Sequence, residues 1–98
     1  MKENYTKEPK KKTAAFRKLE EQYWAAEKAL SEAEDELDAA KDVLEKTETA
    51  YVKGRVRPKT CVDKYKKYTD ALAFKTEAET TYYKLEARYE AAKRKAAQ

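Results

Sequence analysis

Apolar side chains recur at alternating intervals of three and four residues between Phe16 and Tyr51, with no Gly or Pro among them. The series consists of Phe16, Leu19, Tyr23, Ala26, Leu30, Ala33, Leu37, Ala40, Leu44, Thr47 and Tyr51. This spacing places every member on one side of a helix and is typical of a coiled-coil seam. The pattern therefore predicts one long helix whose apolar side packs against another helix.

Helix stop and start signals divide the chain into two helices. Gly54 is placed where a left-handed residue ends a helix, and Pro58 follows it. Thr60 with Asp63 three residues later resembles a capping box that opens a second helix. We predict a helix over residues 13–53, a turn over 54–59 and a helix over 60–97, which form a single helical-hairpin domain, 13–98. Residues 1–12 contain five lysines and Pro9 and predict a flexible basic arm.

Antiparallel pairing of the two helices sets large side chains against small ones in nearly every layer. The pairs are Leu44 with Ala71, Leu37 with Ala78, Ala33 with Tyr82, Ala26 with Tyr89 and Tyr23 with Ala92, and Leu30 faces Leu85. Alternation of this kind resembles the alanine-rich packing called an Alacoil. The predicted fold class is all-α: an antiparallel two-helix coiled-coil hairpin with an Alacoil-like seam, able to dimerise into a four-helix bundle.

The second helix carries a further apolar series displaced from its seam, at Val62, Tyr65, Thr69, Leu72 and Thr76. In the expected register Lys64 and Lys75 fall on the inner side instead. We interpret this as an apolar face that drifts along the helix and serves two partners, the first helix and another protein or a second copy. The alternative is that these side chains merely lie over the hairpin surface. The predicted protein-binding residues are Trp24, Val62, Tyr65, Leu72, Phe74 and Tyr83.

Charge is segregated along a chain that is 43% charged with a net charge of +4. The turn carries four cations that could contact phosphates or a nucleic acid: Lys53, Arg55, Arg57 and Lys59. Residues 18–50 hold eleven acidic and four basic residues. Within them Glu32, Glu34, Asp35, Glu36 and Asp38 predict either a solvated face or an acidic stripe for a basic protein cleft.

The remaining composition argues against several classes of function. There is no His and no Gly-rich phosphate loop, so we expect no enzyme, no cofactor and no metal site. The single cysteine, Cys61, is expected to be a small seam residue. No segment is apolar enough to span a membrane, and the predicted location is cytoplasmic.

Three functions remain open from the sequence. The first is a non-catalytic interaction protein that binds a protein, or a protein–nucleic acid complex, through exposed aromatic and charged faces. The second is a nucleic-acid-associated accessory protein that uses the basic turn and arm. In addition, a short Lys-, Glu- and Tyr-rich helical chain resembles the small inhibitors of phages and mobile elements, such as anti-CRISPR proteins that occupy a host nuclease. That resemblance covers the whole chain but rests on no motif, so it implies inhibition and no particular site residues.

Overall fold

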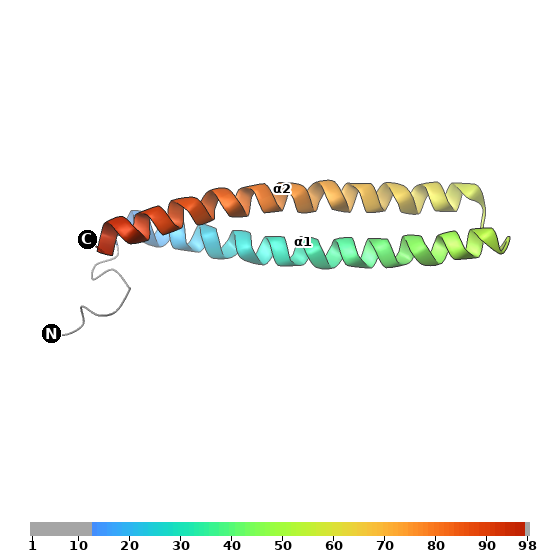
Figure 1. Cartoon of the computed structure of the whole chain (residues 1–98), viewed down its shortest axis with the longest axis horizontal. Helices are drawn as coiled ribbons and strands as arrows, with labels where there is room; N and C mark the ends of the chain where they lie inside the picture. The colour runs from blue at the N-terminus through green and yellow to red at the C-terminus, as the bar shows by residue number, and fades with distance from the viewer. Residues whose placement is uncertain (1–12, 98) are drawn as a thin grey trace.

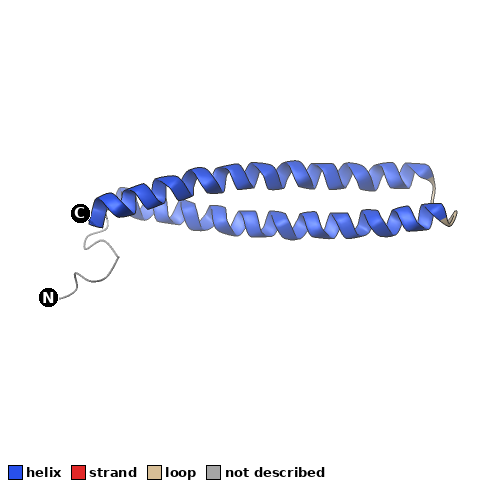
Figure 2. Cartoon of the chain, in the orientation of Figure 1, coloured by secondary structure: helices blue, strands red, loops and turns tan. Residues whose placement is uncertain are grey.

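The computed structural model describes residues 13–97, which form two helices and no strand. Helix α1 spans Ala14–Val52 and helix α2 spans Pro58–Ala97. The helices lie side by side in opposite directions and are joined by a short loop at one end of the rod (Figure 1). Nearly all of the described chain is helical (Figure 2), and its extents are 72 × 20 × 15 Å. The all-α hairpin is thus confirmed, whereas the predicted basic arm, residues 1–12, lies outside the described residues.

Both ends of α1 are capped, and the C-terminal cap is the one that the sequence predicts at Gly54. Thr13 is the N-cap, and its hydroxyl accepts a hydrogen bond from the backbone N–H of Phe16 at 3.0 Å. At the other end Gly54 has φ +74°. The N–H of Gly54 donates to the carbonyl of Tyr51 at 2.9 Å, and that of Arg55 donates to the carbonyl of Ala50 at 2.8 Å. These two bonds form a Schellman motif, which satisfies carbonyls that the helix end would otherwise leave open.

Helix α2 begins earlier than the sequence suggested. It starts at Pro58 rather than Thr60, so the loop is shorter than the expected turn over 54–59. Proline fits the first helical position because its missing N–H needs no partner there. The capping box is also wrong: the backbone N–H of Thr60 donates to Arg57 at 3.0 Å, and Asp63 accepts from the Lys59 ammonium at 3.2 Å.

The inner side of α1 follows the predicted spacing. Ala33 is fully buried, Phe16, Ala26 and Leu44 are also buried, and the remaining members of the series are half-buried with one exception. Tyr51 is 46% exposed, because it lies one residue before the end of α1, where the facing chain is loop. The buried core of the hairpin is therefore a narrow row that mixes two alanines with Phe16 and Leu44, and Glu20 is buried beside it.

The inner side of α2 forms one unbroken series, and the displaced apolar residues Val62, Tyr65 and Leu72 lie exposed outside it. The half-buried positions at alternating three- and four-residue intervals are Cys61, Lys64, Tyr68, Ala71, Lys75, Ala78, Tyr82, Leu85, Tyr89 and Ala92. Lysine is tolerated there because its aliphatic stem packs while its ammonium reaches the edge of the seam. The Lys75 ammonium lies 3.1 Å from the Glu79 carboxylate. That carboxylate raises the pKa of Lys75 by its hydrogen bond and its charge, and Glu34 of α1 adds to the effect.

The register between the helices differs from the expected one by about one heptad. Tyr23 packs between Tyr82 and Tyr89 instead of facing Ala92, and the Cys61 thiol lies 3.8 Å from the carbonyl of Thr47. The early start of α2 contributes to this shift, because a shorter loop moves the centre of the hairpin toward Gly54.

Candidate functional site

Four aromatic rings stack between the helices at the end of the hairpin opposite the loop. In order they are Phe16, Tyr89, Tyr23 and Tyr82, taken alternately from α1 and α2. Successive ring centroids are 5.8, 4.7 and 5.5 Å apart, and no neighbouring pair of rings is inclined by more than 21°. Stacked rings at these distances attract one another beyond simple burial. We refer to these four residues as the aromatic stack, and it holds the open end of the hairpin together.

Hydroxyl and carboxylate groups border the aromatic stack on one side. The hydroxyls of Tyr23 and Tyr82 lie 3.2 Å apart. Tyr82 also donates to Glu86, and Tyr89 donates to Glu20, each at 3.4 Å. The hydrogen bond with Tyr23, partial burial and the negative charge of Glu86 together raise the pKa of Tyr82 above its usual value of 10.0. The phenol therefore stays protonated at neutral pH and acts as a structural hydrogen-bond partner.

Carboxylates from both helices gather on the same side of the hairpin. Glu20 contacts Tyr89, Glu27 and Glu86 act on Tyr82, and Glu34 and Glu79 act on Lys75. On each helix these glutamates are spaced by seven residues, so they repeat along one flank of the seam. We call this side the carboxylate face. It comprises, on each helix, the positions that lie a multiple of seven residues from these glutamates, together with the position four residues after each of them.

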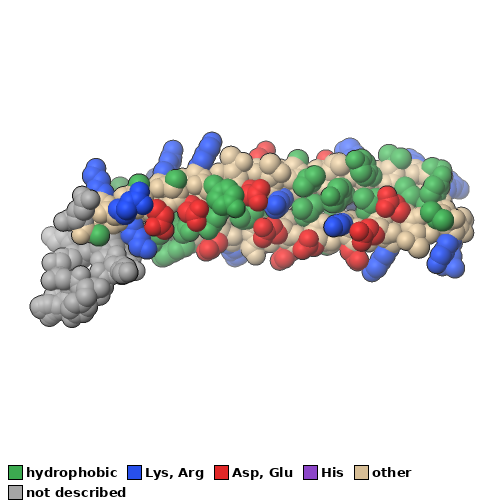
Figure 3. Space-filling model, in the orientation of Figure 1, with side chains coloured by type: hydrophobic (Ala, Val, Ile, Leu, Met, Phe, Trp, Pro, Cys, Tyr) green, Lys and Arg blue, Asp and Glu red, His purple; other side chains and the backbone are tan. Residues whose placement is uncertain are grey.

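The carboxylate face is strongly acidic. Its carboxylates are Glu20, Glu27, Glu34, Asp38, Glu45, Glu48, Glu79, Glu86 and Glu90, and its cations outside the seam are Arg17, Lys41 and Lys93. Figure 3 views the hairpin from this side and shows carboxylates along α1 beside hydrophobic side chains of α2. The signal in the sequence for this arrangement is the seven-residue spacing of the glutamates, which places them on one flank of each helix.

That predicted run does not form one stripe. Glu34 and Asp38 lie on the carboxylate face, Glu32 and Glu36 lie on the opposite side, and Asp35 points away from α2. The reason is the 100° rotation per helical residue, which spreads near-consecutive side chains around the helix. The five predicted acidic residues are therefore divided into two pairs on opposite sides of the helix and one residue between them.

Most of the predicted protein-binding residues lie on the carboxylate face. Tyr65 and Leu72 precede Glu79 at seven-residue intervals, and Val62 and Tyr83 lie one turn from these positions. The exposed fractions of the four side chains range from 41% for Leu72 to 64% for Val62. We call these four residues the apolar stripe. Trp24 of α1 lies on the same face, between Glu20 and Glu27, and is 52% exposed.

Phe74 is separated from the other predicted residues. It lies across the seam from the apolar stripe, beside a hollow that Ala26, Ala29, Glu77, Ala78 and Thr81 also line. The sequence placed it off the seam correctly but did not reveal which flank it occupied. The structure thus divides the predicted binding set between two opposite sides of the hairpin.

The cationic loop is exposed as expected. Lys53, Arg55, Arg57 and Lys59 are all exposed, and Lys59 is engaged in the ion pair with Asp63. Figure 3 shows cationic side chains at this end of the rod.

The comparisons with known proteins give no family for this chain: no family model, no curated protein and no solved structure matches it.

Within residues 13–97, no group of His, Cys, Asp or Glu side chains could hold a metal ion. In the same range neither helix offers a stretch that is long and apolar enough to cross a membrane. The cysteine, Cys61, is half-buried against the backbone of α1.

Proposed function

We propose that this chain is a non-catalytic interaction protein, in which an antiparallel coiled-coil hairpin presents its carboxylate face to another protein. The observation that carries the proposal is the apolar stripe. Val62, Tyr65, Leu72 and Tyr83 are each at least 41% exposed along one helix flank. The ring contacts of Tyr65 and Tyr83 are with their neighbours on α2, Tyr68 and Tyr82, and not with α1. Contiguous exposed apolar side chains with a polar border mark protein-binding surfaces.

The composition of this face supports a basic protein as the partner. Tyrosine and tryptophan supply much of the binding energy in known interfaces, and here they alternate with carboxylates. Eight carboxylates that are not buried, against three cations, attract a cationic surface and repel nucleic acid; Glu20, the ninth, is buried. The same repulsion disfavours pairing of two carboxylate faces in a homodimer. A nuclease inhibitor that occupies a basic cleft, the function implied by the resemblance to phage inhibitors, is one form of this proposal.

Site-specific photo-crosslinking in the source cells tests the proposal. A benzophenone amino acid at Leu72 is expected to capture a protein partner, because this side chain lies in the middle of the apolar stripe. The same amino acid at Thr80 is the matched control, since Thr80 is an exposed residue of α2 that points away from α1. The proposal fails if position 72 captures nothing, or if both positions capture the same proteins with equal yield.

A second candidate function is nucleic-acid contact through the loop. It is favoured by the exposed Arg55 and Arg57 around Gly54 and by Tyr51, which is exposed enough to stack on a base. Three phosphate contacts predict that affinity for a single strand falls about 20-fold between 50 and 200 mM salt. Fluorescence anisotropy with a labelled oligonucleotide measures this, and reversal of both arginines to Glu should abolish binding. Equal binding by the reversed variant would exclude this function for the loop.

A further inference from the structure

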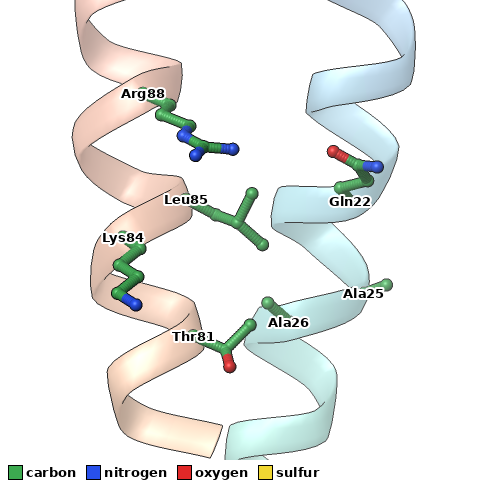
Figure 4. Close-up of a pocket in the computed structure, with 7 residues that line it drawn as sticks. All are labelled: Gln22, Ala25, Ala26, Thr81, Lys84, Leu85 and Arg88. Atoms are coloured by element: carbon green, nitrogen blue, oxygen red, sulfur yellow. The ribbon is translucent and has the colours of Figure 1, made fainter.

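The side of the hairpin opposite the carboxylate face contains a groove. Gln22, Ala25, Ala26, Thr81, Lys84, Leu85 and Arg88 line a hollow of about 560 Å³. In Figure 4 Leu85 points into it from α2 while Gln22 and Arg88 approach each other above Leu85. A second hollow, of about 210 Å³, shares Ala26 and Thr81 with the first and ends at Phe74. The two hollows form one continuous groove with an apolar floor.

Phe74 is an exposed aromatic side chain at one end of this groove. It is 50% exposed, and Asp70 and Glu77 flank it one turn away in each direction. The larger hollow begins at Thr81 and ends at Arg88, about 10–20 Å further along α2 at 1.5 Å per residue. A phenylalanine side chain cannot span that distance, so Phe74 does not fill the larger hollow of its own chain.

We propose that this groove receives Phe74 of a second copy of the chain in a two-fold symmetric dimer. The charges around the two features are complementary. Phe74 is flanked by carboxylates, whereas the larger hollow has Lys84 and Arg88 on its rim. With Phe74 seated near Leu85 of the second copy, Asp70 approaches Arg88 and Glu77 approaches Lys84 of that copy. Because a two-fold axis repeats every contact, each pair occurs twice.

The position of the axis also favours this arrangement. It passes midway between Phe74 and the larger hollow, near Ala78 of α2 and Ala29 of α1, where small side chains allow close approach. That point is also the middle of α2, so the two hairpins overlap along nearly their full length. A face of 72 × 20 Å offers more than the roughly 800 Å² per partner that a stable interface buries.

The dimer leaves both carboxylate faces outward on opposite sides of a four-helix assembly. Each copy can then bind its own partner, so the assembly is bivalent. The dimer does not depend on the function proposed above, because it uses the other side of the hairpin.

Sedimentation velocity on the full chain and on matched variants tests the dimer. The wild type is expected to sediment as a dimer. Phe74→Ala should weaken association at least about tenfold, as expected for a central aromatic anchor. Leu72→Ala is the control, because Leu72 is similarly exposed on the same helix but lies on the carboxylate face. It should leave the dimer intact.

Charge reversal gives an independent test. Arg88→Asp and Asp70→Arg should each weaken the dimer, and the two together should restore it, because the reversed pair attracts again. Helical circular dichroism confirms that each variant is folded. A wild type that stays monomeric up to millimolar concentration overturns the proposal. So does a dimer that persists undiminished with Phe74→Ala, or a double reversal that fails to restore association.

Discussion

At the scale of single residues, the loop depends on the one residue that can turn left-handed without strain. Gly54 has φ +74°, and a Cβ built on it would meet no atom within 4 Å. The free-energy cost of a side chain at this position therefore comes from the left-handed backbone conformation and not from contact with neighbouring atoms. The Schellman hydrogen bonds of Gly54 and Arg55 require this conformation.

Gly54→Ala is accordingly expected to lower the free energy of unfolding by about 1 kcal/mol. Urea unfolding followed by circular dichroism measures the change. Lys53→Ala provides the control, since Lys53 has φ −83° and should tolerate alanine. Equal stability of wild type and Gly54→Ala would mean that the loop adopts another conformation in solution.

Tyr82 makes the stability of the aromatic stack sensitive to alkaline pH. Its pKa is raised in the folded chain, mainly by the hydrogen bond with Tyr23, whereas an unfolded tyrosine ionises near pH 10. The stabilisation from neutral Tyr82 is therefore complete below about pH 10 and is lost as pH rises toward the higher folded value. Above pH 10 the unfolding free energy of the wild type should fall more steeply than that of Tyr82→Phe. Parallel curves for the two chains would contradict the assignment, and Tyr65→Phe, at an exposed position, should follow the wild type.

At the scale of the elements, α2 is the weaker half of the interface between the helices. It has no fully buried residue, and two of its ten inner positions are lysines. A polar residue at a seam position lowers stability but restricts the registers that two helices can adopt. Lys75 can satisfy its charge here because Glu79 and Glu34 lie beside it.

Lys75→Leu is therefore expected to raise the midpoint of thermal unfolding, because an aliphatic side chain fits the seam without a charge to solvate. Lys66→Leu is the control: Lys66 lies on the outer side of α2, 3.8 Å from Asp70 and largely exposed, so the midpoint should stay within error. A lower midpoint for Lys75→Leu would show that the pair with Glu79 stabilises the hairpin on balance.

At the scale of the whole molecule, the two sides of one thin rod have different chemistry. One side combines carboxylates with the apolar stripe, and the other has the groove with Phe74. A two-helix rod has no interior beyond its seam, so every further function must use one of these sides, the loop or the ends. The division allows self-association and partner binding to occur together.

Small-angle scattering checks the assembly as a whole. In the proposed dimer the hairpins overlap along their length, so the longest dimension should change by less than about 10% on dimerisation while the cross-section increases. Phe74→Ala measured at the same concentration should keep the thinner cross-section. An increase in length would indicate end-to-end association through the loop or the open ends.

The sequence by itself determined the two helices, the position of the loop and which residues of α1 face inward. These follow from local rules: three-four spacing, and a glycine followed by a proline. It also showed that Trp24 and Val62 lie off the seam. Local rules were less reliable at the start of α2, where Pro58 and Thr60 each offered a reasonable first turn.

Only the tertiary structure decided the register and the assignment of exposed residues to the two sides. The alternation of large and small residues repeats every heptad, so sliding one helix by seven residues preserves nearly all of it. In one register Tyr23 faces Ala92, and in the other it packs between Tyr82 and Tyr89. Spacing alone does not distinguish these two registers, whereas the stacking of four rings selects the second. The placement of Phe74 and Leu72 on opposite sides likewise depends on which flank of α2 meets α1. That choice is a property of the two packed helices and not of either helix alone.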